Sequence, residues 1–166
     1  MTWKPIILAA ILAVWGLPAA AQDWIGTFED WSVFEYAEGG GKVCYISSTP
    51  LDMSPKNVNR GDVFMQVVNN TDDDTKNVVN IVAGYTFQDN SAVVATINNV
   101  EFRMFTAGDG AWNSSTDKDN EMVQAMIRGA ELVVAGESSR GTNTTDTYSL
   151  LGFTAAHRAM TEACGG

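Results

Sequence analysis

Four carboxylates lie in one glycine-containing stretch of the sequence around Trp112. They are Asp109, Asp117, Asp119 and Glu121. Carboxylates this close in sequence can bind Ca²⁺, which takes about six to eight oxygen ligands. A pair such as Asp109 and Glu121 can also perform acid–base catalysis when its surroundings separate the two pKa values. The spacing does not match an EF-hand loop, and Asp117 or Asp119 is better explained as a helix cap, so we predict no metal site.

A second candidate is the polar stretch from Ser138 to Thr142, which follows an apolar run. The guanidinium of Arg140 can hold an anionic group, and Gly141 lets the backbone approach a ligand closely. In the alternative interpretation, Arg140 ties the loop to an acidic neighbour and Gly141 fills a turn. The candidate binding residues of the chain are Asp109, Trp112, Ser139, Arg140, Gly141 and Thr142.

His157 is the single histidine of the chain. A Ser-His-acid triad needs a serine and a carboxylate arranged around the imidazole in space. The sequence has no Gly-x-Ser-x-Gly elbow, and the 3.6-residue periodicity places His157 on the polar face of the last helix. We therefore predict no catalytic residue and no cofactor.

The N-terminus has the three parts of a secretory signal. Lys4 supplies the positive start, residues 6–17 form an apolar run, and residues 19–21 are the small alanines that precede a cleavage site. The run is shorter than the about 20 residues of a membrane-spanning helix. We predict cleavage near Gln22, with residues 1–21 as the signal peptide and no transmembrane span after cleavage. The mature protein would then be periplasmic, secreted or at the cell surface.

The two cysteines, Cys44 and Cys164, both lie beyond this segment. In an oxidising compartment, one intramolecular disulfide is the simplest expectation. It would close a loop that contributes on the order of 4 to 5 kcal/mol in the chain-entropy model. Two free thiols or a metal pair are the alternatives, and zinc fits poorly because there is one histidine and no neighbouring cysteine.

Acidic residues outnumber basic residues 20 to 10, and the formal net charge is −10. This balance argues against nucleic acid as a partner, because duplex binding depends on clustered Lys and Arg. It also argues against docking on an anionic membrane surface. Acidity of this kind is typical of a soluble exported protein.

Hydrophobic patterning predicts one all-β domain at residues 30–166, after a loosely held lead-in segment at residues 22–29. Residues 63–68 and 78–87 are apolar runs on either side of an Asp-rich connection, which is typical of a hairpin. Further strands are expected at residues 92–97, 100–105 and 130–135, with a tight Asn98-Asn99 turn between the first two.

Two short helices interrupt the strands. The first is capped by Asp117 or Asp119, has apolar residues at i, i+4 spacing and ends at Gly129. The second follows Phe153, with the Thr154 hydroxyl as its cap. Its last inward-facing residue is Cys164, in agreement with the expected disulfide.

Several short motifs follow one another in an order and spacing that is familiar. They are Asp30–Val33, Val43–Pro50, Gly84–Phe87, Phe105 with Ala111-Trp112, Met126–Gly129, Ser138–Thr142, Asp146–Leu150 and Gly152–Ala156. Together they resemble the invasion-associated locus B family of exported bacterial proteins. The sequence departs from many members at Glu35, where those members have the cysteine of a Trp-x-Val-x-Cys pattern. Their disulfide pattern therefore cannot be transferred.

The resemblance implies an immunoglobulin-like antiparallel β-sandwich in the periplasm or at the surface of a Gram-negative cell, without an established enzyme activity. The family name comes from members linked to entry into host cells. We expect a sandwich with two short helices, one of them C-terminal, and a Cys44–Cys164 bridge. It would bind a protein partner in the envelope or at the cell surface, in host-cell interaction, invasion or envelope stability. The alternative is an envelope hydrolase that uses Asp109 and Glu121.

Overall fold

The computed structural model describes residues 22–165, so the expected signal peptide at residues 1–21 lies outside the described residues. The elements are β1 (Asp23–Phe28), β2 (Trp31–Glu38), β3 (Gly41–Ser48), β4 (Asp52–Ser54), β5 (Phe64–Asn70), β6 (Thr75–Val82), β7 (Ala92–Ile97), β8 (Val100–Ala107), β9 (Gly110–Trp112), α1 (Thr116–Arg128), β10 (Glu131–Glu137), β11 (Asn143–Ser149) and α2 (Phe153–Ala163).

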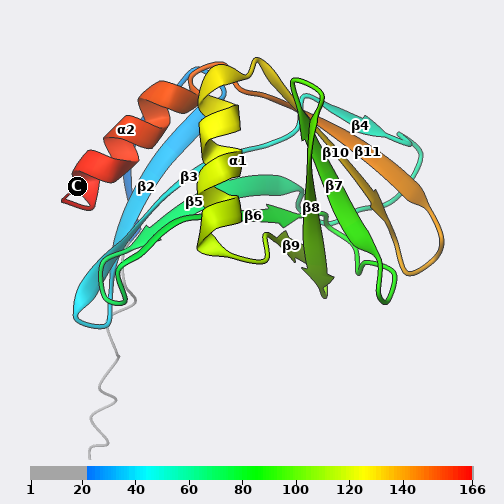
Figure 1. Cartoon of the computed structure of the whole chain (residues 1–166), viewed down its shortest axis with the longest axis horizontal. Coiled ribbons are helices and arrows are strands. Elements are labelled where there is room, and N and C mark those ends of the chain that lie inside the picture. The colour runs from blue at the N-terminus through cyan, green and yellow to red at the C-terminus, as the bar shows by residue number, and fades with distance from the viewer. Residues whose placement is uncertain (1–21, 166) are drawn as a thin grey trace, which may run out of the picture.

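The strands form one antiparallel sheet that bends into two halves. Neighbouring strands follow the order β1-β2-β3-β5-β6-β9-β8-β7-β10-β11-β4. Figure 1 shows β2, β3, β5 and β6 on one side of the bend and β7, β8, β10, β11 and β4 on the other, with α1 and α2 over the first half. The predicted all-β sandwich with two helices, one of them C-terminal, is confirmed.

The predicted hairpins form where the turn residues indicated them. β5 pairs with β6 across the Asp-rich turn. β7 pairs with β8 across Asn98 and Asn99, whose φ angles are 49° and 63°. Two successive residues with positive φ are what a tight type I′ hairpin turn requires, and asparagine tolerates this conformation better than most residues.

The strand expected at residues 78–87 is shorter than predicted, because β6 ends at Val82. Gly84 has a φ of +69°, and its carbonyl accepts a hydrogen bond from the Gly61 amide at 2.8 Å. A Cβ at Gly84 would lie 2.7 Å from the Gly61 oxygen. The chain therefore turns out of β6 where two backbone segments meet, and Phe87 then bridges to Ser138 beside β10.

The lead-in segment at residues 22–29 also differs from the expectation. Asp23–Phe28 forms β1, which pairs antiparallel with β2 and interrupts its register between Trp24 and Gly26. Most of its residues are exposed. Its weak hydrophobic alternation explains why the sequence pattern did not indicate a strand, since pairing here relies on the backbone.

The N-cap of α1 differs from the predicted Asp117 or Asp119. Ser115 is the N-cap, and its hydroxyl accepts a hydrogen bond from the Lys118 amide at 3.3 Å. Asp119 is buried instead, where it accepts hydrogen bonds from the Val79 amide at 3.1 Å and the Asn113 side chain at 3.0 Å. Burial raises the pKa of Asp119, partly offset by these two donors. The helix ends at Gly129 as predicted.

The start of α2 is set by a glycine rather than by a hydroxyl cap. Gly152 is the N-cap with a φ of +86°, and a Cβ there would collide with the carbonyl of Phe28. The Thr154 hydroxyl instead donates to the Ile127 carbonyl at the end of α1. Glycine is required because β1 crosses directly against this turn.

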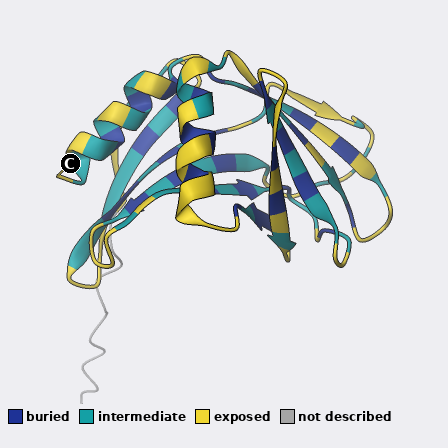
Figure 2. Cartoon of the chain, in the orientation of Figure 1, coloured by how far each residue is buried: buried dark blue, intermediate teal, exposed yellow. Residues whose placement is uncertain are grey.

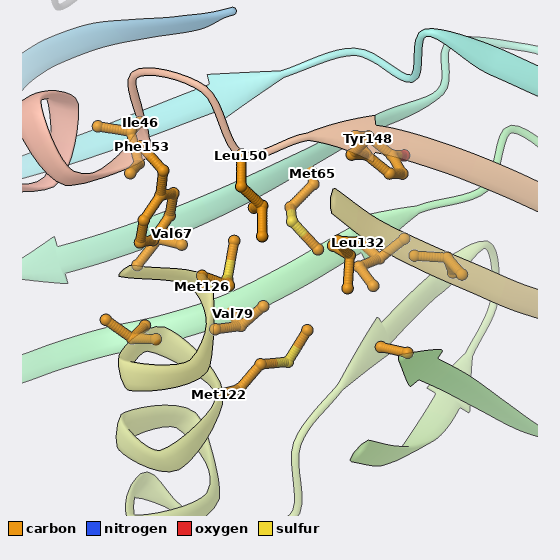
Figure 3. Packing of buried hydrophobic residues seen from close by; sticks show 14 of the residues in the cluster. Ile46, Met65, Val67, Val79, Met122, Met126, Leu132, Tyr148, Leu150 and Phe153 are labelled. Atoms are coloured by element: carbon orange, nitrogen blue, oxygen red, sulfur yellow. The ribbon is translucent and has the colours of Figure 1, made fainter. Parts of the chain in front are cut away.

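Alternating burial along the strands defines the core. Figure 2 shows buried and partly exposed residues alternating on the strands, and an exposed stripe along each helix. α2 packs on β2 and β3, and α1 packs on β6. Figure 3 shows side chains from β3, β5, β6, β10, β11 and both helices meeting in one cluster; among them are Ile46, Met65, Val67, Val79, Met122, Met126, Leu132, Tyr148, Leu150 and Phe153.

The expected disulfide is present. Cys44 on β3 and Cys164 at the end of α2 are bonded at 2.03 Å, with a sequence separation of 120. Cys44 is fully buried, so the bridge fastens the C-terminal helix to the centre of the first half-sheet. None of the helices formed by residues 22–165 is long and apolar enough to cross a bilayer.

Candidate functional site

The two loops singled out from the sequence meet at one end of the fold through the segment between β6 and β7. The Ala83 amide donates to the Asp109 carbonyl at 2.9 Å, in the turn between β8 and β9. On the other side, the Ser139 amide donates to the Thr86 carbonyl at 2.8 Å, in the turn between β10 and β11. The loops are therefore held in fixed positions on either side of one connecting segment.

The turn between β10 and β11 is built by its own serine and glycine. The Gly141 amide donates to the Ser138 carbonyl at 2.8 Å, and the φ of Gly141 is +77°. The Ser138 hydroxyl accepts from the Thr142 amide at 3.1 Å. Gly141 thus fills a turn, as the alternative interpretation of this stretch predicted. Arg140 is exposed, however, and has no ion-pair partner among residues 22–165.

A buried ion pair lies beneath this turn. Both terminal nitrogens of Arg60 donate to the two carboxylate oxygens of Asp146, each at 2.6 Å. The side chains are only 6% and 3% exposed. Burial alone would lower the pKa of Arg60, but the hydrogen bonds and negative charge of Asp146 outweigh it, so the pKa of Arg60 is raised. Because bidentate Arg–carboxylate pairs fix geometry strongly, this pair holds the Val58–Val63 loop against β11.

Further polar contacts complete the buried cluster around Arg60. Its guanidinium donates twice to the Ala83 carbonyl, at 2.9 and 2.8 Å, and lies 5.0 Å from the centre of the Tyr85 ring. The Tyr85 hydroxyl is 2.6 Å from that of Thr144. The Tyr148 hydroxyl is buried on the same face of β11 and has no hydrogen-bond partner within residues 22–165. Burial raises the pKa of Tyr148 far above its ordinary value, with the Asp146 charge adding to the effect.

A pocket of about 250 Å³ opens above this cluster. It is lined by Val58, Asn59, Arg60, Tyr85, Ser138, Arg140, Thr142 and Thr144. Two of the candidate residues, Arg140 and Thr142, line it, while Ser139 and Gly141 form the turn at its rim. The pocket can bind a hydrogen-bond acceptor, because Arg140 and Ser138 offer N–H and O–H donors from a turn held by backbone hydrogen bonds. Its lining includes no carboxylate or imidazole that could act as a general base.

Asp109 and Trp112 do not line this pocket. Trp112 pairs in register with Asn80 of β6 and Phe105 of β8. Its ring stacks on that of Phe105, with centroids 6.0 Å apart, and covers Gly110. Asp109 is exposed in the adjacent turn. The structure therefore ties both candidate loops to one connecting segment, but Arg140 lines the pocket whereas Trp112 packs on Phe105.

Comparisons with known proteins decide the family. The family model described as Invasion associated locus B (IalB) protein matches residues 31–161. The chain belongs to the IalB family. The crystal structure of invasion associated protein B from Bartonella henselae has the same fold, with a TM-score of 0.60 and 20% sequence identity over 85% of this chain and 98% of that chain. No match was found among curated proteins.

Within this IalB-family domain, sequence reasoning missed the residue at the base of the pocket. Arg60 lies in an irregular polar loop, and its partner Asp146 is 86 positions further along the chain. No local pattern connects them. Tyr85 and Asp146 fall within the short motifs that indicate the family resemblance. Membership of these motifs is the one sequence signal that could have pointed to the pocket.

The arrangement of Asp109 and Glu121 gives the hydrolase alternative no support. Glu121 lies on α1, where it is exposed and paired with Lys118 at 2.6 Å. It lines a surface groove together with Asp117 and other α1 residues, and Asp109 is not part of that groove. Within residues 22–165 no group of three or more His, Cys, Asp or Glu side chains is placed to hold a metal ion.

His157 is half-buried on α2 rather than fully on its polar face. Its Nε2 lies 2.8 Å from the Oδ1 of Asn77, and its ring stacks on Phe153 at 5.9 Å. Asn77 also donates to Asn120 of α1 at 2.8 Å. The histidine thus joins α2 to β6 and α1, which is a structural role. Burial lowers the pKa of His157 from its ordinary 6.5.

This lowered pKa predicts a pH-dependent loss of stability. Because the unfolded state takes up the proton first, His157 contributes stability above about pH 6.5 that is lost as the pH falls through its folded pKa. We expect the drop in unfolding free energy between pH 7.5 and pH 5.5 to be smaller in His157→Gln than in the unmodified protein. Urea titrations at both pH values measure it. Equal drops in the two proteins would contradict the prediction.

Proposed function

We propose that this protein is exported to the bacterial cell envelope and acts there by binding a protein partner, without catalysis. The Cys44–Cys164 disulfide supports export, since such bonds persist in oxidising compartments. The strong negative charge supports a protein rather than nucleic acid as the partner. The Bartonella henselae relative is described as invasion associated, which supports a role in host-cell interaction over one in envelope stability.

The observation that carries the proposal is the donor-lined pocket at the loop end of the fold. Rigid backbone hydrogen bonds hold its rim, and the buried Arg60–Asp146 pair forms its base. Arg140 is exposed at the rim, without an ion-pair partner in the described part of the chain. Arginine is enriched among the few residues that carry most of the binding energy of protein interfaces. The pocket's lack of a general base favours binding over hydrolysis.

Site-specific crosslinking in living cells tests this proposal. A photoreactive residue at Ser139 should give a discrete protein adduct, identified by mass spectrometry, and a photoreactive residue at Lys76 should not. Figure 1 shows the start of β6, where Lys76 lies, far from the turn between β10 and β11. Adding Arg140→Ala should reduce the adduct at Ser139 by about tenfold or more, as expected for an anchor of about 1.5–3 kcal/mol.

The second candidate loop is tested in the same cells. Trp112→Ala will leave the Ser139 adduct unchanged, because Trp112 packs on Phe105 and does not line the pocket beside Arg140. If Arg140→Ala and Trp112→Ala both leave partner capture unchanged, neither loop is the binding site. Identical adducts at Ser139 and Lys76 would show that the loop end is not selective.

A further inference from the structure

The pocket beside Arg140 is an exception in the charge distribution of this protein. The chain carries 20 acidic and 10 basic residues. The pocket is nevertheless lined by two arginines, Arg60 and Arg140, and by no aspartate or glutamate. In a strongly acidic protein, a concave site with this composition attracts negatively charged groups that the remaining surface repels.

The two arginines have different roles in the pocket. Arg60 is neutralised by Asp146 and donates in addition to the Ala83 carbonyl, so four of its five N–H groups are used. Arg140 makes no ion pair within residues 22–165. The formal charge that remains for a ligand is therefore +1. A single negative charge is matched by this site, whereas a dianion would keep half of its charge without a partner.

One neutral group beside the pocket can also donate to an acceptor. The Ser138 oxygen accepts from the Thr142 amide, which leaves its O–H group able to donate. The Thr144 hydroxyl donates to the Gly136 carbonyl at 3.5 Å, and the Tyr85 hydroxyl lies 2.6 Å from that of Thr144, so these two hydroxyls bond within the protein. A carboxylate is an acceptor-only group, and its two oxygens fit the fork of an arginine.

The size of the pocket indicates how this carboxylate is presented. Its volume of about 250 Å³ is below the roughly 300–1,000 Å³ of pockets that enclose a drug-sized ligand. It suits the end group of a longer molecule that continues along the surface. Capture of a C-terminal carboxylate is an established mode of peptide recognition.

We infer that the pocket lined by Arg60, Ser138, Arg140 and Thr142 binds the C-terminal carboxylate of a partner polypeptide. Arg140 pairs with the carboxylate, and the Arg60–Asp146 pair keeps the base of the pocket rigid. The inference rests on the proposed function and specifies which part of the partner is bound.

Binding of a short peptide in two forms tests the inference. The probes are N-acetyl-alanyl-alanine with a free carboxylate and the same peptide with a C-terminal amide. In NMR titrations at pH 7, the free acid should shift the backbone amide signals of residues 138–142 saturably. The amide should bind about tenfold more weakly or worse, because it loses the charge-assisted hydrogen bonds.

Variants of the exposed arginines provide the matched controls. Arg140→Gln should weaken the free acid about tenfold, and Arg140→Lys should bind between the two, because lysine keeps the charge but not the fork. Arg158→Gln, which removes an exposed arginine on α2, should bind like the unmodified protein. Equal binding of acid and amide, or no effect of Arg140→Gln, would overturn the inference. Acetate that binds as tightly as the peptide would overturn the assignment to a chain end.

The outcome is separable from that of the crosslinking experiment. If the peptide binds as described but Ser139 captures no protein in cells, the carboxylate site stands and the proposed function fails. If a partner is captured whose binding survives C-terminal amidation or extension, the proposed function stands and the carboxylate site fails.

Discussion

Replacing Cys44 and Cys164 together with alanine will lower the free energy of unfolding by about 4 to 5 kcal/mol. The bridge spans 120 residues, so without it the unfolded chain regains a large amount of conformational freedom. Domains of this kind have a total stability of about 5–15 kcal/mol. The variant will therefore lose a large fraction of its stability. Alanine is chosen because Cys44 is fully buried, and serine would add the separate cost of a buried hydroxyl.

Guanidinium titrations of the two proteins measure this effect. The slope of unfolding free energy against denaturant should increase in the variant, because an unfolded chain without the crosslink exposes more surface. The unmodified protein unfolded in excess dithiothreitol is the control and should resemble the variant. A loss below about 1 kcal/mol would contradict the chain-entropy argument. It would mean that the packing of α2 on β2 and β3 holds the helix in place without the disulfide.

Breaking the buried ion pair will have the next largest effect. Asp146→Asn leaves the Arg60 charge buried beneath the pocket, and Arg60→Met leaves the Asp146 charge there. Each should cost about 3–5 kcal/mol, the range for removing one partner of a buried pair. The side chains are 6% and 3% exposed, so solvent relieves little of this cost. Arg60→Met also removes the two donors of the Ala83 carbonyl.

The double variant distinguishes lost pairing from lost packing. Arg60→Met combined with Asp146→Asn removes both charges, so it should be less destabilised than the sum of the two single variants by about 2 kcal/mol or more. Urea unfolding of the four proteins in this cycle provides the coupling energy. Additive single effects would show that the two charges do not depend on each other. The matched surface control, Lys56→Met on the exposed Lys56–Asp52 pair, should leave the stability nearly unchanged, because solvent screens an exposed pair.

Much of the sandwich could be predicted because its signals are local. Alternating apolar residues indicated β7 and β8, and Asn98-Asn99 indicated their turn. The ends of elements were less predictable where distant backbone decides them. β6 stops at Val82 because Gly84 meets Gly61, and α2 begins at Gly152 because β1 crosses it. Similarly, aspartate is a common helix-capping residue, but Asp119 is buried against β6, where it accepts a hydrogen bond from the Val79 amide.

The candidate site was predictable only in part, for a related physical reason. The turn around Arg140 could be recognised from its serine, arginine and glycine, because turn chemistry is local. Its pocket requires Arg60, whose position depends on pairing with Asp146 across 86 residues. Trp112 does not line this pocket, because its ring packs on Phe105. Which surface a side chain faces at such a loop follows from strand register, which composition does not determine.

The position of the disulfide has a consequence for biosynthesis. Cys44 is translated 120 residues before Cys164, so most of the domain is made between the two. The thiol of Cys44 must therefore wait, unpaired with its native partner, until α2 has been synthesised. A product that terminates before Cys164 cannot be locked covalently at all. Covalent closure thus requires that translation has passed the last helix.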